Sequence, residues 1–161
     1  MYVNICISAK SVRLTGSGGA MANALDTEVK AAYETAKWNT GRALFGNGIG
    51  ILTTIEALGE AGNTVKVADT AYLKEGLIVD VYEDDNEIPV STRRIVSVDR
   101  PNKAVTLSGE AATFKAGFIT VQNSYKREIT GLGAIFDDSV ETIYGVDKAT
   151  NPYLRPVTMN G

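Results

Sequence analysis

The amino-acid sequence predicts an α+β fold in which one long helix precedes a small antiparallel β-barrel or sandwich. Apolar side chains recur every three to four residues over about residues 20–45, which is the period of an amphipathic helix. From Ile49 the period changes to two, and short runs rich in Val, Ile and Thr alternate with turn residues. Between the two regions, Gly46 suits the left-handed conformation that closes a helix, and Asn47-Gly48 then turns the chain. The change of period therefore divides the chain into a helical part and a β-rich part.

The predicted helix is too long for its own surroundings. Its apolar side chains lie along one side: Leu25, Val29, Ala32, Tyr33, Ala36, Ala43 and Leu44. At 1.5 Å per residue, roughly 25 residues span about 38 Å, which is about the width of a small domain. Such a helix requires a partner surface elsewhere in the chain or on another chain. We expect Val29, Ala32, Tyr33 and Ala36 to face the segments that flank the β-rich part, and Trp38 to lie at or beside a contact.

Six short strands are predicted between about residues 50 and 123. Each run has four to eight residues, and turn-forming residues separate most neighbouring runs. The runs cover residues 50–57, 63–69, 76–83, 93–99, 103–109 and 117–123. Ala71–Glu75 interrupts them and predicts a single helical turn. Short antiparallel strands of this kind form barrels or sandwiches, so residues 49–123 are predicted to be a β-rich domain.

The flanking segments give weaker signals. Tyr2–Ala9 alternates apolar and polar residues and predicts a half-buried strand whose pairing partner is not nearby in sequence. Lys10–Leu14 suits one helical turn. Leu132–Asp137 predicts a short helix, Ile143–Val146 predicts a brief strand, and the proline-containing tail that follows is predicted to be extended.

The composition argues against several classes of function. The formal charge of −3 disfavours a nucleic-acid binder that neutralises phosphates. No apolar run reaches the ~18 residues that cross a bilayer, and the first residues lack the pattern of a signal peptide. Cys6 is the only cysteine, so no disulfide can form within the chain. The chain has no histidine, which removes Ser–His–Asp and Cys–His catalysis and the usual zinc sites. We therefore expect no enzyme activity, no catalytic residues, no cofactor and no metal.

Two motifs allow both a functional and a structural interpretation. Residues 46–50, GNGIG, are similar to a phosphate-binding loop, but they follow a helix and precede a strand, and no lysine directly follows them. A plain helix-to-strand turn is the favoured interpretation. Asp137, Asp138 and Glu141 are close enough in sequence for paired-carboxylate catalysis, but nothing in the sequence marks a pocket around them.

Two clusters of charge lie in the β-rich part. The acidic cluster consists of Asp80, Glu83, Asp84, Asp85 and Glu87, and the basic cluster consists of Arg93, Arg94, Arg100 and Lys103. The acidic cluster lacks the ligand spacing of a calcium loop, so a solvated hairpin tip is favoured over a cation site. The basic cluster is either ordinary surface charge or a patch that meets an acidic partner, including the acidic tip of another copy of this chain.

One composite pattern resembles the major capsid proteins of tailed bacteriophages and prophages. Its parts, in chain order, are EVKAAYETAKWNTGRALFGNGIG, VADTAYLKEGLIVDVY, RRIVSVDRPNKAVTLSG and TGLGAIFDDSVETIYGVDKATNPYLRP. In that group a long spine helix ends in an FGxG-like turn, a small β-rich insertion follows, and the chain returns through a TGLxAIF…YG…NP(W/Y) segment. Each motif is short, and the resemblance rests on their order and spacing over about residues 2–157.

The resemblance implies part of the tailed-phage capsid fold. Residues 1–48 and 124–161 would belong to a peripheral domain that carries the spine helix, and residues 49–123 would form an insertion domain. Relatives carry further segments before and after this region, so the chain is expected to be a central fragment or a shortened reading frame.

The implied function is that of a structural coat subunit that associates with copies of itself into an icosahedral shell. Its location would be the virion capsid, or the bacterial cytoplasm during assembly or expression from a prophage. Neither a membrane nor a specific nucleic-acid sequence is an expected partner. The predicted contacts between subunits are Trp38, Asp84, Asp85, Glu87, Arg93, Arg94, Arg100 and Lys103.

Two other hypotheses remain. A small β-barrel could act as a binding module for a sugar, a peptide or nucleic acid, using a loop or one face of the sheet. That role requires exposed aromatic side chains on one face, and the β-rich part offers Tyr72, Tyr82, Phe114 and Phe118. A histidine-free enzyme that uses the carboxylates at 137, 138 and 141 is the third hypothesis, and no other feature of the sequence supports it.

Overall fold

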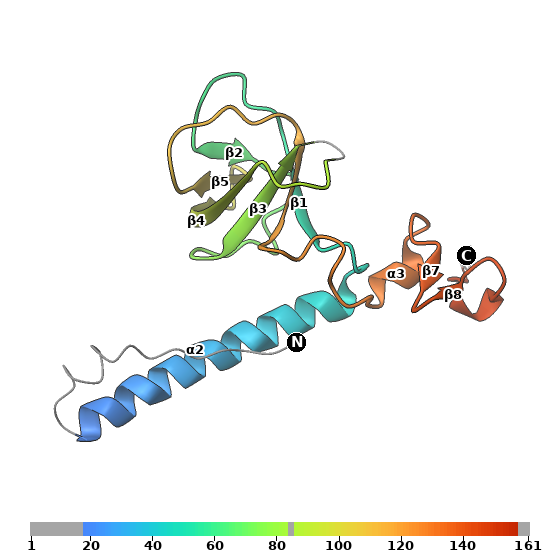
Figure 1. Ribbon diagram of the computed structural model, residues 1–161, viewed down its shortest axis with the longest axis horizontal. Coiled ribbons are helices and arrows are strands. Elements are labelled where there is room, and N and C mark those ends of the chain that lie inside the picture. The colour runs from blue at the N-terminus through green and yellow to red at the C-terminus, as the bar shows by residue number, and fades with distance from the viewer. Residues whose placement is uncertain (1–17, 84–85, 158–161) are drawn as a thin grey trace.

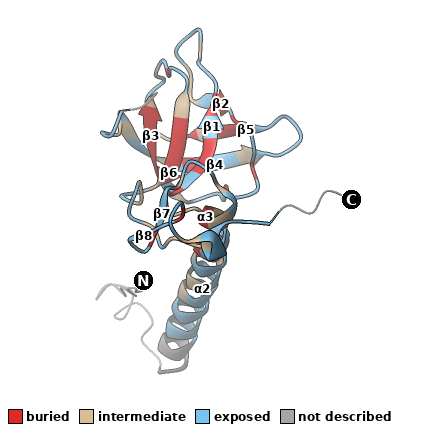
Figure 2. Ribbon diagram, turned by 90° about the vertical axis from the view of Figure 1, so that its right-hand side faces the viewer, coloured by how far each residue is buried: buried red, intermediate tan, exposed pale blue. Residues whose placement is uncertain are grey.

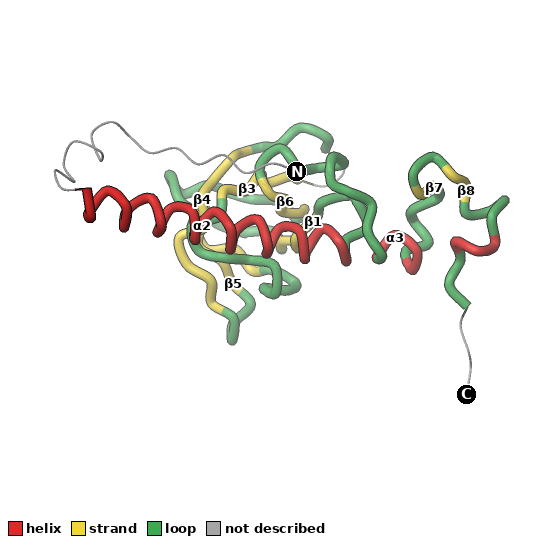
Figure 3. The backbone as a smooth tube through the Cα atoms, turned by 90° about the horizontal axis from the view of Figure 1, so that it is seen from below, coloured by secondary structure: helices red, strands yellow, loops and turns green. Residues whose placement is uncertain are grey.

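The computed structural model describes residues 18–83 and 86–157 (Figure 1). The predicted strand Tyr2–Ala9 and the predicted turn Lys10–Leu14 lie outside the described residues, as do Asp84 and Asp85. Within the described parts, one long helix runs beneath a small β-domain. The chain after the β-domain, residues 124–157, is called the returning segment, and it continues beyond the end of the helix (Figures 1 and 3).

Helix α2, Gly18–Phe45, confirms the predicted long helix and has 28 residues. The expectation that its apolar stripe faces other segments is wrong in part, because Val29 is 44 % exposed and Tyr33 is 66 % exposed. Ala32 and Ala36 are half-buried. The physical reason is the point of attachment: the rest of the chain reaches the helix close to its last turns, and the N-terminal half diverges from the β-domain (Figure 1).

All six predicted strands are confirmed. They are β1 Ile51–Ile55, β2 Thr64–Lys66, β3 Ile78–Glu83, β4 Ser91–Asp99, β5 Ala104–Leu107 and β6 Gly117–Val121. They form one antiparallel sheet in the order β1-β6-β3-β4-β5-β2, which curls into a half-barrel. A single bridge between Ile55 and Val67 brings the two ends of the sheet together. The Glu56 amide donates to the Lys66 carbonyl at 3.0 Å beside this bridge.

The concave face of the curled sheet holds the hydrophobic core. The core side chains are Leu52, Ile55, Val65, Val67, Leu73, Val79, Val81, Ile95, Val105, Leu107, Phe114 and Ile119. Figure 2 shows this burial concentrated in the strands, while most of α2 is exposed. Because strand side chains alternate between faces, one face of each strand supplies this core.

The outer face of β3 and β6 is buried as well. Tyr82 stacks on Phe118 with ring centroids 4.9 Å apart, and Tyr125 lies 4.9 Å from both rings. Asp80, predicted to belong to a solvated hairpin tip, is instead 1 % exposed. It accepts hydrogen bonds from the Thr92 hydroxyl and from the Asn123 amide. Asp80 is buried because the chain that leaves β6 folds back over this face.

Burial raises the pKa of the Tyr82 phenol, and the nearby Asp80 charge raises it further. The phenol therefore stays neutral at physiological pH, as a buried ring beside a carboxylate must.

The returning segment contains α3 Gly133–Phe136, β7 Thr142–Ile143, β8 Val146–Asp147 and the 3-10 turn η1 Pro152–Leu154. The short helix confirms the prediction over Leu132–Asp137. The predicted strand Ile143–Val146 is instead the centre of a hairpin, because Tyr144 and Gly145 take positive φ values of 51° and 80°. The tail is not wholly extended, since Pro152 begins η1.

Ala71–Glu75, predicted to be a single helical turn, forms two successive tight turns instead. The Leu73 amide donates to the Thr70 carbonyl at 3.1 Å, and the Leu77 amide donates to the Lys74 carbonyl at 3.3 Å. Leu73 is fully buried in the core. Leu73 thus anchors the loop in the core at the point between its two turns.

The last turn of α2 docks on the returning segment through the backbone. The Leu132 amide donates to the Leu44 carbonyl at 2.7 Å, and the Gly131 amide donates to the Gly46 carbonyl at 3.1 Å. These bonds satisfy carbonyls at the end of the helix that have no partner within it. The approach is so close that a Cβ at Gly131 would lie 2.3 Å from the carbonyl oxygens of Ala43 and Leu44.

A bidentate ion pair fixes the same junction. Arg42, on α2, contacts both carboxylate oxygens of Glu128, 86 positions later in the chain. The two side chains are 9 % and 10 % exposed. Just beyond the end of α2, Asn47 donates a hydrogen bond from Nδ2 to Asp137 at 2.8 Å. Its Oδ1 accepts a hydrogen bond from the Ile49 backbone amide at 3.1 Å. Residues 46–50 are thus a helix-to-strand turn, as favoured from the sequence.

We predict that the β-domain folds alone. A fragment covering Gly48–Arg127 keeps the whole core and the Tyr125 ring that covers the outer face, so it should unfold cooperatively on heating. Circular dichroism measures this transition. A fragment with an unfolded spectrum and no thermal transition would show that the β-domain depends on α2.

We predict that Gly131→Ala destabilises the junction by about 1–3 kcal/mol, the usual cost of overpacking, because its Cβ would meet helix carbonyls. Gly41→Ala is the matched control, since a Cβ there meets nothing within 4 Å. It should stabilise the helix by about 1 kcal/mol. Urea titration followed by Trp38 fluorescence compares the two, and equal effects would contradict the close packing.

We predict that Glu128→Gln costs about 3 kcal/mol, because it leaves the Arg42 guanidinium buried without its counter-charge. Glu87→Gln is the control: it breaks the exposed Glu87–Lys126 pair and should change stability little. The same urea titration serves as the measurement. A Glu128→Gln midpoint indistinguishable from that of Glu87→Gln would contradict a structural role for the buried pair.

Candidate interaction surface

Trp38 lies in a groove between α2 and the loop that precedes β3. The groove has a volume of about 560 Å³ and is lined by Glu34, Lys37, Trp38, Gly41, Arg42, Phe45, Ala71, Tyr72 and Lys74. Two aromatic side chains open onto it, with Phe45 64 % exposed and Tyr72 41 % exposed. Leu73 anchors this loop in the core of the β-domain, and Lys74 of the loop lies over the Trp38 ring.

The groove is positively charged around an aromatic floor. The Lys74 amine lies 4.7 Å from the centroid of the Trp38 ring, and the Arg42 guanidinium carbon lies 5.6 Å from it. Such cations are attracted by the negative face of the indole. Glu128 neutralises Arg42, whereas Lys37 and Lys74 form no ion pair within the described residues. The groove therefore suits an occupant that is both apolar and acidic.

The basic residues predicted as contacts divide into two kinds. Arg93 is occupied within its own domain: it donates to the carbonyls of Ser108 and Glu110 and lies over the Phe114 ring at 5.0 Å. Arg100 also donates internally, to the Thr70 carbonyl at 3.2 Å. Arg94 and Lys103 are exposed. Arg93 and Arg100 therefore have structural roles that the sequence did not reveal.

Of the acidic residues predicted as contacts, the structure describes Glu87. Its carboxylate accepts a hydrogen bond from the Lys126 amine at 2.7 Å, which lowers the pKa of Glu87. Asp84 and Asp85 lie outside the described residues. Within the described parts of the chain, no ion pair joins the acidic cluster to the basic cluster.

Apolar side chains are exposed on α2 and on the returning segment. On the helix, Leu25, Val29 and Tyr33 follow one another at four-residue spacing and are 45 %, 44 % and 66 % exposed. On the returning segment, the exposed large apolar side chains are Ile129, Leu132, Phe136, Tyr144, Val146, Tyr153 and Val157. Exposed apolar side chains that lie together mark sites of interaction on soluble proteins, so these two groups are the candidate contact surfaces among the described residues.

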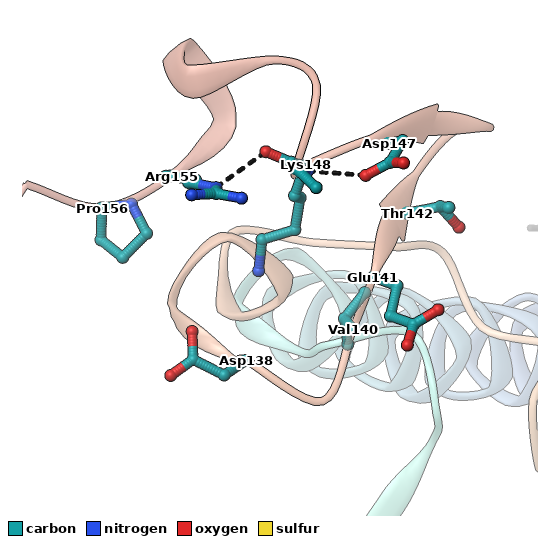
Figure 4. A pocket seen from close by; sticks show the side chains of 9 residues that line it. Asp138, Val140, Glu141, Thr142, Asp147, Lys148, Arg155 and Pro156 are labelled. Atoms are coloured by element: carbon teal, nitrogen blue, oxygen red, sulfur yellow. Dashed lines mark hydrogen bonds between the residues drawn. The ribbon is translucent and has the colours of Figure 1, made fainter.

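A second hollow, of about 620 Å³, lies beside the β7–β8 hairpin (Figure 4). Lys148 lines it but is 7 % exposed. Its amine donates to the carbonyls of Ala134 and Asp137, both at 2.9 Å, and so caps the end of α3. Arg155 in turn donates from Nε to the Lys148 carbonyl at 2.9 Å. Both cations thus hold the returning segment together.

The three carboxylates considered for catalysis, at positions 137, 138 and 141, do not form a catalytic pair in the structure. Hydrogen bonds from Ser139 and then from Asn47 lower the pKa of Asp137, so it stays ionised as an acceptor. Asp138 and Glu141 line the hollow, and in Figure 4 their carboxylates point away from each other. This geometry gives the enzyme hypothesis no support. Among the described residues, no group of three or more His, Cys, Asp or Glu side chains suits a metal ion.

Sequence reasoning missed the Arg42–Glu128 pair and the buried Lys148. A signal for the first was present in the glycines at 131 and 133, which mark a close approach by another backbone. No local pattern distinguishes Lys148 from an exposed lysine, because its burial depends on α3 lying against it.

Among the described helices, none has the length and apolar character needed to cross a membrane. Comparison with known protein families, curated proteins and solved structures found no match to this chain.

Proposed function

We propose that this chain is a structural subunit of a phage or prophage capsid and that it works by association with copies of itself. The observation that carries the proposal is the row of exposed apolar side chains Leu25, Val29 and Tyr33 on a helix whose N-terminal half diverges from the β-domain. The capsid-like order of sequence motifs supports the same role. The proposed location is the virion, or the bacterial cytoplasm during assembly.

The mechanism in this proposal is geometric. A 28-residue helix about 42 Å long presents one apolar side to neighbouring copies, while the β-domain stays folded around its own core. Repetition of one contact around symmetry axes then builds a shell without any chemical step. The docked junction at Arg42 and Gly131 holds the helix at a fixed angle to the β-domain, so each copy offers the same surfaces.

The alternative of a β-barrel binding module has weaker support. Of the four aromatic residues that could form a binding face, Tyr82, Phe114 and Phe118 are at most 8 % exposed. Tyr72 is exposed, but it opens onto the groove beside α2 and not onto the sheet. A sugar or base would thus find no row of aromatic rings among the described strands.

Self-association is the property to test. Sedimentation velocity across a range of concentrations should show the chain forming larger species, and electron microscopy should then show their form. Val29→Asp with Tyr33→Asp should raise the association midpoint at least tenfold, since each change removes an apolar side chain worth about 1.5–3 kcal/mol when buried.

Ala31→Asp is the matched control, because Ala31 is an exposed residue of the same helix outside the apolar row. It should leave association nearly unchanged. A parent chain that sediments as a monomer at every concentration would contradict the proposal.

A further inference from the structure

We propose that the groove around Trp38 receives the loop Asn86–Val90 of a second copy. This inference rests on the proposed self-association and names the surfaces that meet. Ile88 would enter the aromatic-lined groove, and the Glu87 carboxylate would face Lys37 and Lys74.

The loop offers an apolar side chain that nothing in its own copy covers. Ile88 is 78 % exposed and Val90 is 52 % exposed. The loop is nevertheless held at both ends, because the Val90 amide donates to the Val81 carbonyl at 2.8 Å and the Asn86 amide donates to the Glu83 carbonyl at 3.2 Å. A held loop loses little conformational freedom on binding, which favours its use as a contact.

The loop and the groove have complementary charge. The loop carries the Glu87 carboxylate, whose side chain is 73 % exposed, and its surface pair with Lys126 is weak enough to be exchanged for a new partner. The groove presents the amines of Lys37 and Lys74, with Glu34 the single acidic side chain among those that line it. Charge complementarity of this kind guides partners together and rejects wrong ones, while the buried apolar side chain supplies most of the affinity.

A single copy cannot make this contact with itself. The groove is lined by Ala71–Lys74, just before β3, whereas the loop follows β3. Strand β3 runs from the groove side of the β-domain to its far side (Figure 1). The five steps of about 3.3 Å between its six residues hold the two surfaces roughly 17 Å apart.

The contact is therefore between two different surfaces of neighbouring copies. Such a head-to-tail contact leaves one free loop and one free groove on every dimer, so it repeats either into a closed ring or into an open array. This property distinguishes it from a two-fold contact, which is complete in the dimer.

Disulfide trapping in the full chain tests the proposal. In a Cys6→Ser background, Ile88→Cys with Lys74→Cys should give a ladder of dimers, trimers and larger species on mild oxidation. A mixture of the two single-cysteine chains should stop at the dimer. The ladder should weaken at high salt, because the charges that align the copies are screened.

Val96→Cys with Lys74→Cys is the matched control, because Val96 is 55 % exposed on β4 outside the loop. It should give no ladder. The parent chain could associate while the Ile88→Cys and Val96→Cys variants, each with Lys74→Cys, cross-link equally or not at all. That result overturns this inference and leaves the proposed function standing. A parent chain that stays monomeric overturns both.

Discussion

The buried pair between Arg42 and Glu128 is the interaction on which the arrangement of the chain depends. It joins the end of the long helix to the segment that leaves the β-domain, across 86 positions of sequence. Two charges taken out of water are tolerated only where each satisfies the other with good geometry, and here both carboxylate oxygens are engaged. The pair favours this placement of helix and β-domain, because separating the two side chains within it would leave a buried charge unpaired.

Close backbone packing reinforces this placement. Gly131 and Gly133 lie against the final carbonyls of α2, where any side chain would collide, and the amides beside them satisfy the helix end. Lys148 then caps α3 from the other side. A chain of contacts thus runs from the helix through α3 to the β7–β8 hairpin. All of it lies near the last turns of α2, which explains why the earlier turns of the helix remain exposed.

The β-domain, by contrast, contains its own sources of stability. Its core lies on the concave face of the curled sheet, and the outer face of β3 and β6 is covered by Tyr125 and by the buried hydrogen bonds of Asp80. The exposed features that remain are therefore at its periphery, namely the loop around Ile88 and the groove beside Trp38. The β-domain thus offers distinct surfaces at its ends, and the helix that carries it has an exposed apolar side. Both features suit repeated contacts between copies.

The sequence by itself determined the long helix, all six strands and the helix-to-strand turn between them, because periodicity and turn residues are local signals. The prediction that Trp38 lies at a contact between subunits stays a prediction, and the structure places Trp38 in a groove beside Lys74. Only the tertiary structure decided which charges are structural: Arg42, Arg93 and Lys148 look like surface cations until distant segments are placed against them. It likewise decided that Asp80 is buried and that Tyr144 turns a hairpin. The physical reason is that burial and pairing depend on contacts between residues far apart in the chain, and one-dimensional patterns do not record those contacts.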